Sequence, residues 1–208
     1  MRNARATRAA DQESELADKA THHSRDCSRT SSIIEEKPNI QIIDAKQEAL
    51  KEKDIRSIVE IECDPKVREW LYEYVLLDFE KEFKSYIQFF RKLPQNKKAD
   101  ILLAKCDGIV VGFLGLWRLD AYMPHVATIG VSVDPCYWGK GVGTALVRSA
   151  INLAKRKEYK RLEIETLAEN ASMRQLAVRA GFKLESLRKN RVMRNGSYFD
   201  EVAYSLLL

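Results

Sequence analysis

The sequence predicts an α/β (α+β) fold, with a central mixed, mostly antiparallel, twisted sheet flanked by helices. Three observations support this. Runs rich in β-branched and aliphatic residues occur at 100–105, 109–118 and 126–133 and again near the end of the chain. Segments with apolar residues at helical spacing separate these runs. Asp-Gly at 107–108 and Asn-Gly at 195–196 are hairpin-turn dipeptides, so the strands beside them are expected to be antiparallel.

The first half of the chain is expected to form one strand, two helices and three strands. Residues 40–44 alternate like a strand, and apolar residues at helical spacing follow from Leu50 to Ile61. The Asp64-Pro65 step ends that helix. A long second helix is expected over 66–92, because apolar and aromatic residues recur there at helical spacing.

In the second half, a helix is expected at 143–157, a strand at 162–167 and a helix at 172–179 that ends at Gly181. Two strands, at 182–187 and roughly 198–207, complete the order β-α-α-β-β-β-α-β-α-β-β. The apolar character of residues 198–208 would suit an edge strand poorly, which leaves a homodimer through these strands open.

Length and composition indicate one globular domain with an extension. Residues 1–36 contain no aromatic residue and no sustained apolar period, so they are expected to be disordered or weakly helical, and 37–208 to fold. With 45% hydrophobic and 31% charged residues, the chain has the balance of a soluble protein, and it has no apolar run long enough for a membrane span. No secretory or organellar targeting segment is evident, so a cytoplasmic location is expected.

Metal and nucleic-acid binding are both disfavoured. The four cysteines contain no CxxC pair, and His22-His23 beside Cys27 lacks further ligands to close a metal shell. The net charge is +5, but 30 acidic residues are mixed among 35 basic ones. The basic segment 188–191 with Arg194 has no interleaved aromatics, so it is a weak nucleic-acid signal. A basic cleft for an anionic cofactor explains the charge more simply.

A glycine-rich loop, Gly139-Lys140-Gly141-Val142-Gly143-Thr144, lies between a strand and a helix. A helix N-terminus offers free N–H groups and partial positive charge, glycines let a phosphate approach, and Lys140 adds a cation. Such a loop alone would also suit a dinucleotide fold or a P-loop. However, no Gly-Lys-Ser/Thr follows, and the loop comes after three antiparallel-looking strands instead of in a first parallel βαβ unit.

The run from Val133 to Leu146, followed by Asn170 and by Ala180-Gly181-Phe182, resembles the GNAT N-acetyltransferase superfamily. Trp138 stands where the family usually has Gln or Arg. This residue and the segment 194–201 are similar to the RimJ/RimL type of ribosomal-protein N-terminal acetyltransferases and to some amino-acid acetyltransferases.

The resemblance covers about 39–208 and implies the GNAT fold, whose sheet is splayed between its fourth and fifth strands. It implies acetyl-CoA as acetyl donor and a primary amine as acceptor, either a protein or peptide N-terminus or a free amino acid or polyamine. The loop amides would hold the pyrophosphate, the edge of the preceding strand would pair with the pantetheine arm, and Asn170 would flank the thiol end. The cofactor-binding residues implied are Val131, Ser132, Val133, Trp138, Gly139, Lys140, Gly141, Val142, Gly143, Thr144 and Asn170.

Direct attack by an amine needs a general base and an acid for the leaving thiolate. Glu165, on the strand leading to Asn170, is the first candidate base, although it could simply face outward beside Glu163. His125 is the second candidate because an imidazole pKa near 6.5 suits this task. Many family members carry a tyrosine acid seven residues after Asn170, and this chain has Ala177 there.

Ser172 could relay the proton, or it could only cap its helix. The absent tyrosine also leaves open a catalytically silent acyl-CoA-binding module with a regulatory role.

Overall fold

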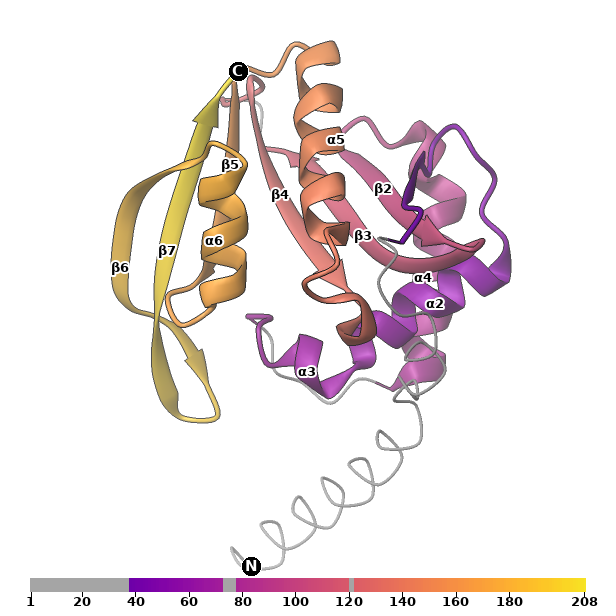
Figure 1. Ribbon diagram of the computed structural model, residues 1–208, viewed down its shortest axis with the longest axis horizontal. Coiled ribbons are helices and arrows are strands. Elements are labelled where there is room, and N and C mark those ends of the chain that lie inside the picture. Colours follow the sequence, from indigo (N-terminus) through magenta and orange to yellow (C-terminus); the bar gives the residue numbers. More distant parts are fainter. Residues whose placement is uncertain (1–37, 73–77, 120–121) are drawn as a thin grey trace, which may run out of the picture.

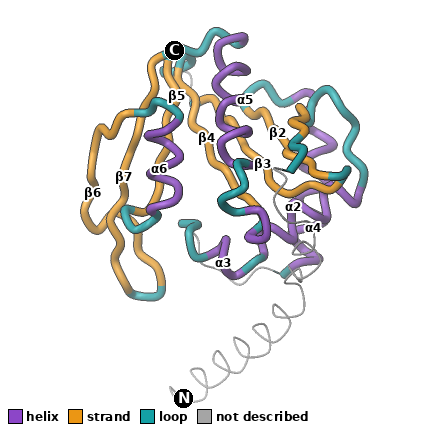
Figure 2. Tube along the Cα trace, in the orientation of Figure 1, coloured by secondary structure: helices purple, strands orange, loops and turns teal. Residues whose placement is uncertain are grey.

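The computed structural model describes residues 38–72, 78–119 and 122–208. A seven-stranded mixed sheet runs through them in the order β1-β2-β3-β4-β5-β7-β6 (Figures 1 and 2). Expectations about residues 1–36, including His22 and His23, lie outside the described residues. The strands are β1 (Gln41–Asp44), β2 (Ala99–Cys106), β3 (Ile109–Arg118), β4 (Val126–Val133), β5 (Arg161–Leu167), β6 (Lys183–Arg194) and β7 (Ser197–Leu207).

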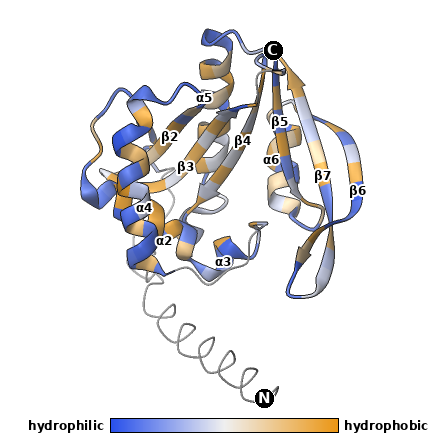
Figure 3. Cartoon of the chain, turned by 180° about the vertical axis from the view of Figure 1, so that it is seen from behind, coloured by the Kyte–Doolittle hydropathy of each residue, from blue (hydrophilic) through white to orange (hydrophobic). Residues whose placement is uncertain are grey.

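Helices cover both faces of the sheet. The face that packs on α5 and α6 is called the α5 face here, and the opposite one, which packs on α2 and α4, the α2 face; Figures 1 and 3 show the two sides. No described helix is both long and apolar enough to cross a membrane. The helices are α2 (Glu52–Cys63), α3 (Pro65–Arg68), α4 (Phe79–Lys92), α5 (Val142–Arg156) and α6 (Ala171–Arg179), with 3-10 turns η2 (Leu93–Gln95) and η3 (Pro135–Tyr137).

Each face has its own hydrophobic core, because successive side chains of a strand point to opposite faces. On the α5 face, Leu146 and Val147 of α5 pack with Leu162 and Ile164 of β5, and all four are fully buried. On the α2 face, buried residues of α2 and α4 pack against β2 and β3; these include Ile58, Val59, Phe83, Phe90, Leu103 and Phe113. The helices therefore hold β1 to β4 as one packed unit.

The long helix expected at 66–92 is wrong. α3 ends at Arg68 and a separate helix, α4, begins at Phe79. The Asp78 carboxylate accepts a hydrogen bond from Lys81 N at 3.1 Å and so caps the new helix. The apolar period continued across this start, which is why the pattern did not reveal it.

The C-terminal hairpin is longer than expected, since β6 runs to Arg194 instead of ending near 187. Asn195 (φ 48°) and Gly196 (φ 76°) form the predicted turn, with positive φ at both positions as a type I′ turn requires. β7 lies between β5 and β6, so it is not a sheet edge. The edge argument for a homodimer therefore does not hold.

β4 and β5 are the one parallel pair among the described strands, and they separate after three residue pairs. The pairs are Val126 with Arg161, Ala127 with Leu162 and Thr128 with Glu163. β4 then continues to Val133 and β5 to Leu167 without further pairing to each other. This confirms the expected splay between the fourth and fifth strands. The space between the diverging ends is called the gap below.

Candidate functional site

The edge of β4 that faces the gap carries unpaired main-chain groups. Asp134 N donates to Val111 O of β3 at 2.9 Å. Bonding alternates along an antiparallel pair, so Gly130 and Ser132 also direct their N–H and C=O groups to β3, while Ile129, Val131 and Val133 direct theirs away from it. The N–H of Ile129 still belongs to the last parallel pair, Thr128 with Glu163, so Val131 and Val133 are the residues that direct both groups to the gap. Ser132 does not offer its main chain there.

The turn after β4 is held by its own side chains. The Asp134 carboxylate accepts from Cys136 N at 2.9 Å, and the Trp138 indole Nε1 donates to Val133 O at 2.7 Å. Trp138 therefore closes the turn by binding a carbonyl at the end of β4. This contact gives Trp138 a structural reason to stand at the start of the loop.

Two of the loop glycines adopt left-handed backbone conformations. Gly139 has φ 73° and Gly141, the N-cap of α5, has φ 89°. Side chains rarely adopt these angles. A Cβ atom at either position would meet nothing within 4 Å, so the space in front of α5 is open. Gly143 serves packing instead, because a Cβ there would lie 3.2 Å from Leu176 Cδ2 of α6.

The loop amides divide into bonded and free groups. Trp138 N donates to Pro135 O at 3.2 Å and Lys140 N to Tyr137 O at 3.3 Å, so these two of the predicted seven are already used. The other five make no hydrogen bond to any described residue; they belong to Gly139, Gly141, Val142, Gly143 and Thr144. Five free donors at the positive end of a fifteen-residue helix form a site suited to a phosphate anion.

Lys140 and Asn170 both have local contacts. Lys140 Nζ lies 5.2 Å from the centre of the Tyr137 ring, so its charge is placed beside the loop by a cation–π contact. The Asn170 side chain accepts from Met173 N at 3.0 Å and caps α6. Asn170 therefore sets where α6 begins, at the end of β5.

Glu165 lies on β5 beyond the last pair with β4, so it borders the gap on the α2 face. Its carboxylate accepts from Arg188 Nη1 at 2.7 Å, and the same nitrogen donates to Glu201 at 2.6 Å. The Glu201 side chain is 3% exposed. Burial and the hydrogen bond to Glu201 raise the pKa of Tyr72, so this phenol keeps its proton. The sequence analysis missed Tyr72, Arg188 and Glu201 in this cluster because they come from distant segments.

His125 and Ser172 lie apart from Glu165. The His125 carbonyl accepts from Lys160 N at 2.9 Å, which places this exposed residue just before the first β4–β5 pair, at the closed end of the gap. Glu165 lies four residues along β5 from Arg161, or about 13 Å at strand spacing. Ser172 is exposed in the first turn of α6. Ala177, at the position of the absent tyrosine, is fully buried.

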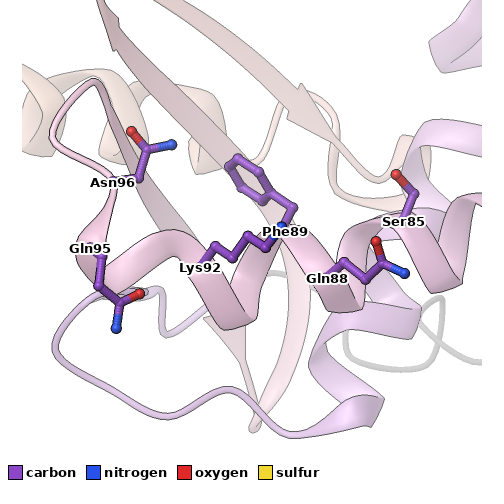
Figure 4. A pocket seen from close by; sticks show the side chains of 6 residues that line it. All are labelled: Ser85, Gln88, Phe89, Lys92, Gln95 and Asn96. Carbon is purple, nitrogen blue, oxygen red and sulfur yellow. The ribbon is translucent and has the colours of Figure 1, made fainter.

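A separate hollow of about 570 Å³ lies outside the gap, along α4 and η2 (Figure 4). It is lined by Ser85, Gln88, Phe89, Lys92, Gln95 and Asn96. No predicted site residue lines it. Within the described part of the chain, no group of three or more His, Cys, Asp or Glu residues could hold a metal ion.

The acetyltransferase (GNAT) domain family matches residues 48–183. The chain belongs to this family. A putative [ribosomal protein bS18]-alanine N-acetyltransferase of Bacillus subtilis is 31% identical over 108 residues, which are 52% of this chain and 70% of that protein. The Escherichia coli L-amino acid N-acetyltransferase AaaT is 33% identical over 101 residues, 48% of this chain and 62% of the relative.

Solved structures share the fold. A putative acetyltransferase from Salmonella typhimurium, solved with its cofactor acetyl-CoA, is 19% identical, with a TM-score of 0.65 over 81% of this chain and 94% of the other. A ribosomal-protein-alanine N-acetyltransferase from Brucella melitensis is 20% identical, with a TM-score of 0.67 over 81% and 99%. This GNAT chain is an N-acetyltransferase with acetyl-CoA as acetyl donor.

Proposed function

We propose that residues 37–208 form an acetyltransferase domain that binds acetyl-CoA in the gap and acetylates a primary amine by direct attack. The proposal rests on one observation, which is that the free edge of β4 is continuous with the free amides of the glycine-rich loop. The Ile129 carbonyl and the free main-chain groups of Val131 lead along β4 to the five free amides at the start of α5. A ligand with amide groups in its arm and a pyrophosphate at its end matches both.

The donor's position follows from this match. Its pyrophosphate accepts from the free loop amides, and Lys140 adds positive charge nearby. Its pantetheine arm pairs with the edge of β4 in place of the missing strand. Because Val133 O is bound by the Trp138 indole and the Ile129 N–H belongs to the last β4–β5 pair, the pairing uses chiefly Val131. The thioester then lies near the point where β4 and β5 diverge.

Glu165 is the proposed general base. The acceptor amine arrives as an ammonium ion and gives one proton to the Glu165 carboxylate, directly or through a water molecule. The neutral nitrogen attacks the thioester carbonyl carbon, the C–S bond breaks as the thiolate leaves, and the nitrogen gives its second proton to water as the amide forms. Arg188 already donates to this carboxylate. It therefore fixes the Glu165 side chain toward the gap, but it competes with the substrate ammonium for the negative charge of the carboxylate.

No described side chain stands out as the acid for the thiolate. Tyr72 holds its proton firmly, since burial raises its pKa, and Ser172 is open to solvent. Protonation of the thiolate by water completes the reaction in this proposal. Orientation of amine and thioester then supplies most of the rate enhancement.

The test is release of the CoA thiol from acetyl-CoA with N-terminal peptides, amino acids and polyamines as acceptors. Glu165→Gln is expected to lower kcat about 10²-fold or more without abolishing it, and to leave the Kd of acetyl-CoA unchanged. Glu158→Gln, an exposed carboxylate in the turn after α5, is the control. Acetyl-CoA binding without release on any amine would support the silent regulatory module instead.

A further inference from the structure

Trp117 of β3 lies over two glycines on the α2 face. A Cβ atom at Gly115 would lie 1.9 Å from the Trp117 ring, and one at Gly130 of the neighbouring strand would lie 3.4 Å from it. Gly115 and Gly130 are paired across β3 and β4. The strands thus omit two adjacent side chains beneath this indole. Trp117 is nevertheless 40% exposed, so the slot positions the ring without burying it.

The ring lies where the gap opens. Trp117 pairs with Thr128, and Thr128 with Glu163 in the last β4–β5 pair. Paired residues point to the same face, so Trp117, Thr128 and Glu163 form a row. Glu165 is the next residue of β5 on this face. Figure 3 shows this face, with α2 and α4 over β2 and β3 and no described helix over β5 and β7.

Two ion-pair groups on this face of β5, β6 and β7 contain more carboxylates than guanidinium groups. Arg161 binds Glu163 and Glu185, and Arg188 binds Glu165 and Glu201. Four carboxylates thus share two guanidinium groups. The surface facing Trp117 favours a cation and disfavours an added carboxylate. An exposed indole face likewise attracts cations.

The edge of β5 adds an unpaired main-chain group. Ala168 N donates to Asp200 O at 2.9 Å and Leu208 N to Lys160 O at 3.0 Å. By alternation, the even-numbered residues of β5 bond to β7, and Glu165 directs its N–H and C=O toward the gap, where β4 no longer pairs. A peptide carries amide groups that can bond there. A polyamine has none, and a free amino acid has a carboxylate instead.

We propose that Trp117 is an acceptor-binding residue, and that the acceptor is a peptide N-terminus whose first residues lie between the indole and Glu165. This inference rests on the proposed function and names its substrate class. The α-ammonium lies between the carboxylates and the face of the indole, and the first peptide group bonds the main chain of Glu165.

The experiment compares an N-terminal alanyl or seryl peptide with free alanine, serine and spermidine in CoA thiol release. The peptide is expected to have a kcat/KM at least about tenfold higher than the free amino acid. Trp117→Ala should raise the acceptor KM about tenfold, and Trp117→Phe should raise it less. The Kd of acetyl-CoA should not change in either variant. Ile109→Ala, a half-exposed residue at the other end of β3, is the matched control.

The outcomes separate the two proposals. Free amino acids or spermidine used better than peptides would leave the acetyltransferase function standing and overturn the peptide assignment. An unchanged acceptor KM in a folded Trp117→Ala protein, checked by its thermal melting curve, would overturn the role of Trp117. Failure to acetylate any amine would overturn this inference together with the proposed function.

Discussion

Arg188 Nη1 lies 2.7 Å from the Glu165 carboxylate, which ties the proposed base to the C-terminal hairpin. The same guanidinium also neutralises Glu201, whose side chain is buried. A substitution of Arg188 removes the charged partner of the buried Glu201 carboxylate. It also removes the group that holds Glu165 toward the gap and competes with a substrate ammonium for its negative charge.

Arg188→Gln is therefore expected to lower the free energy of unfolding by about 2 kcal/mol, since the buried Glu201 carboxylate then keeps the Tyr72 hydrogen bond but no charged partner among the described residues. It should also change kcat/KM, because Glu165 is no longer held toward the gap, whereas Arg188→Lys should restore much of the stability. Urea unfolding and steady-state rates measure the two effects. Arg191→Gln, on an exposed part of the same strand, is the control. An unaltered kcat/KM in Arg188→Gln would argue against Glu165 as the base.

Gly141→Ala places a methyl group in the open space before α5 and strains a residue at φ 89°. We expect a Kd for acetyl-CoA at least about tenfold higher, because one lost phosphate hydrogen bond is worth more than 1 kcal/mol. Gly108→Ala is the matched control, with φ 75°, open space and a place in the β2–β3 turn. Calorimetric titration that finds equal affinities in both variants would refute the assignment of the loop.

Asp100 is 2% exposed and binds two lysines, Lys46 at 2.9 Å and Lys157 at 2.7 Å. This carboxylate joins the end of α5 to β2 and to the segment after β1. Asp100→Ala should lower the free energy of unfolding by about 3 kcal/mol in urea titrations. Glu48→Ala, which removes an exposed carboxylate 3.6 Å from Lys105, should cost less than about 1 kcal/mol. Similar losses for the two variants would contradict the structural role of Asp100.

Glu185 gives an acid-dependent contribution to stability. Hydrogen bonds from Arg161 and then Ser205 lower its pKa from 4.5 to about 2. The unfolded chain therefore binds more protons between these values, so this contribution is complete above the unfolded pKa and is lost as the pH falls through about 2. Glu185→Gln should flatten the decline in stability over this window, measured by urea unfolding at stepped pH. An unchanged slope would show that the ion pair does not persist in solution.

The sequence predicted most strands and α5 closely, because strand-rich runs, turn dipeptides and the glycine loop are local signals. The Asp107-Gly108 turn, for example, has positive φ at both residues. Local signals failed where a cap interrupted a continuing apolar period, as at Asp78. They also could not show that the register with β3 turns the main chain of Ser132 away from the gap.

The residues of the candidate site also fall into two groups, those that local sequence signals predict and those that they do not. The loop amides and Val131 follow from the chain's own order, so they could be predicted. The cluster of Tyr72, Arg188 and Glu201 around Glu165 depends on segments far apart in sequence. The slot beneath Trp117 depends on Gly115 and Gly130 meeting across two strands. Neither relationship has a signature in a single sequence.

Because β4 and β5 pair over three residues each, the two parts of the sheet that they join are only weakly coupled in unfolding. Few hydrogen bonds couple β5, β6, β7 and α6 to the rest, so these elements should open together in hydrogen exchange at a lower free energy than β2 and β3. A ligand lying in the gap acts as a temporary strand. Acetyl-CoA should therefore slow amide exchange on both sides of the gap and raise the melting temperature with the logarithm of its concentration above the Kd. The incomplete sheet thus links cosubstrate concentration to the integrity of the enzyme.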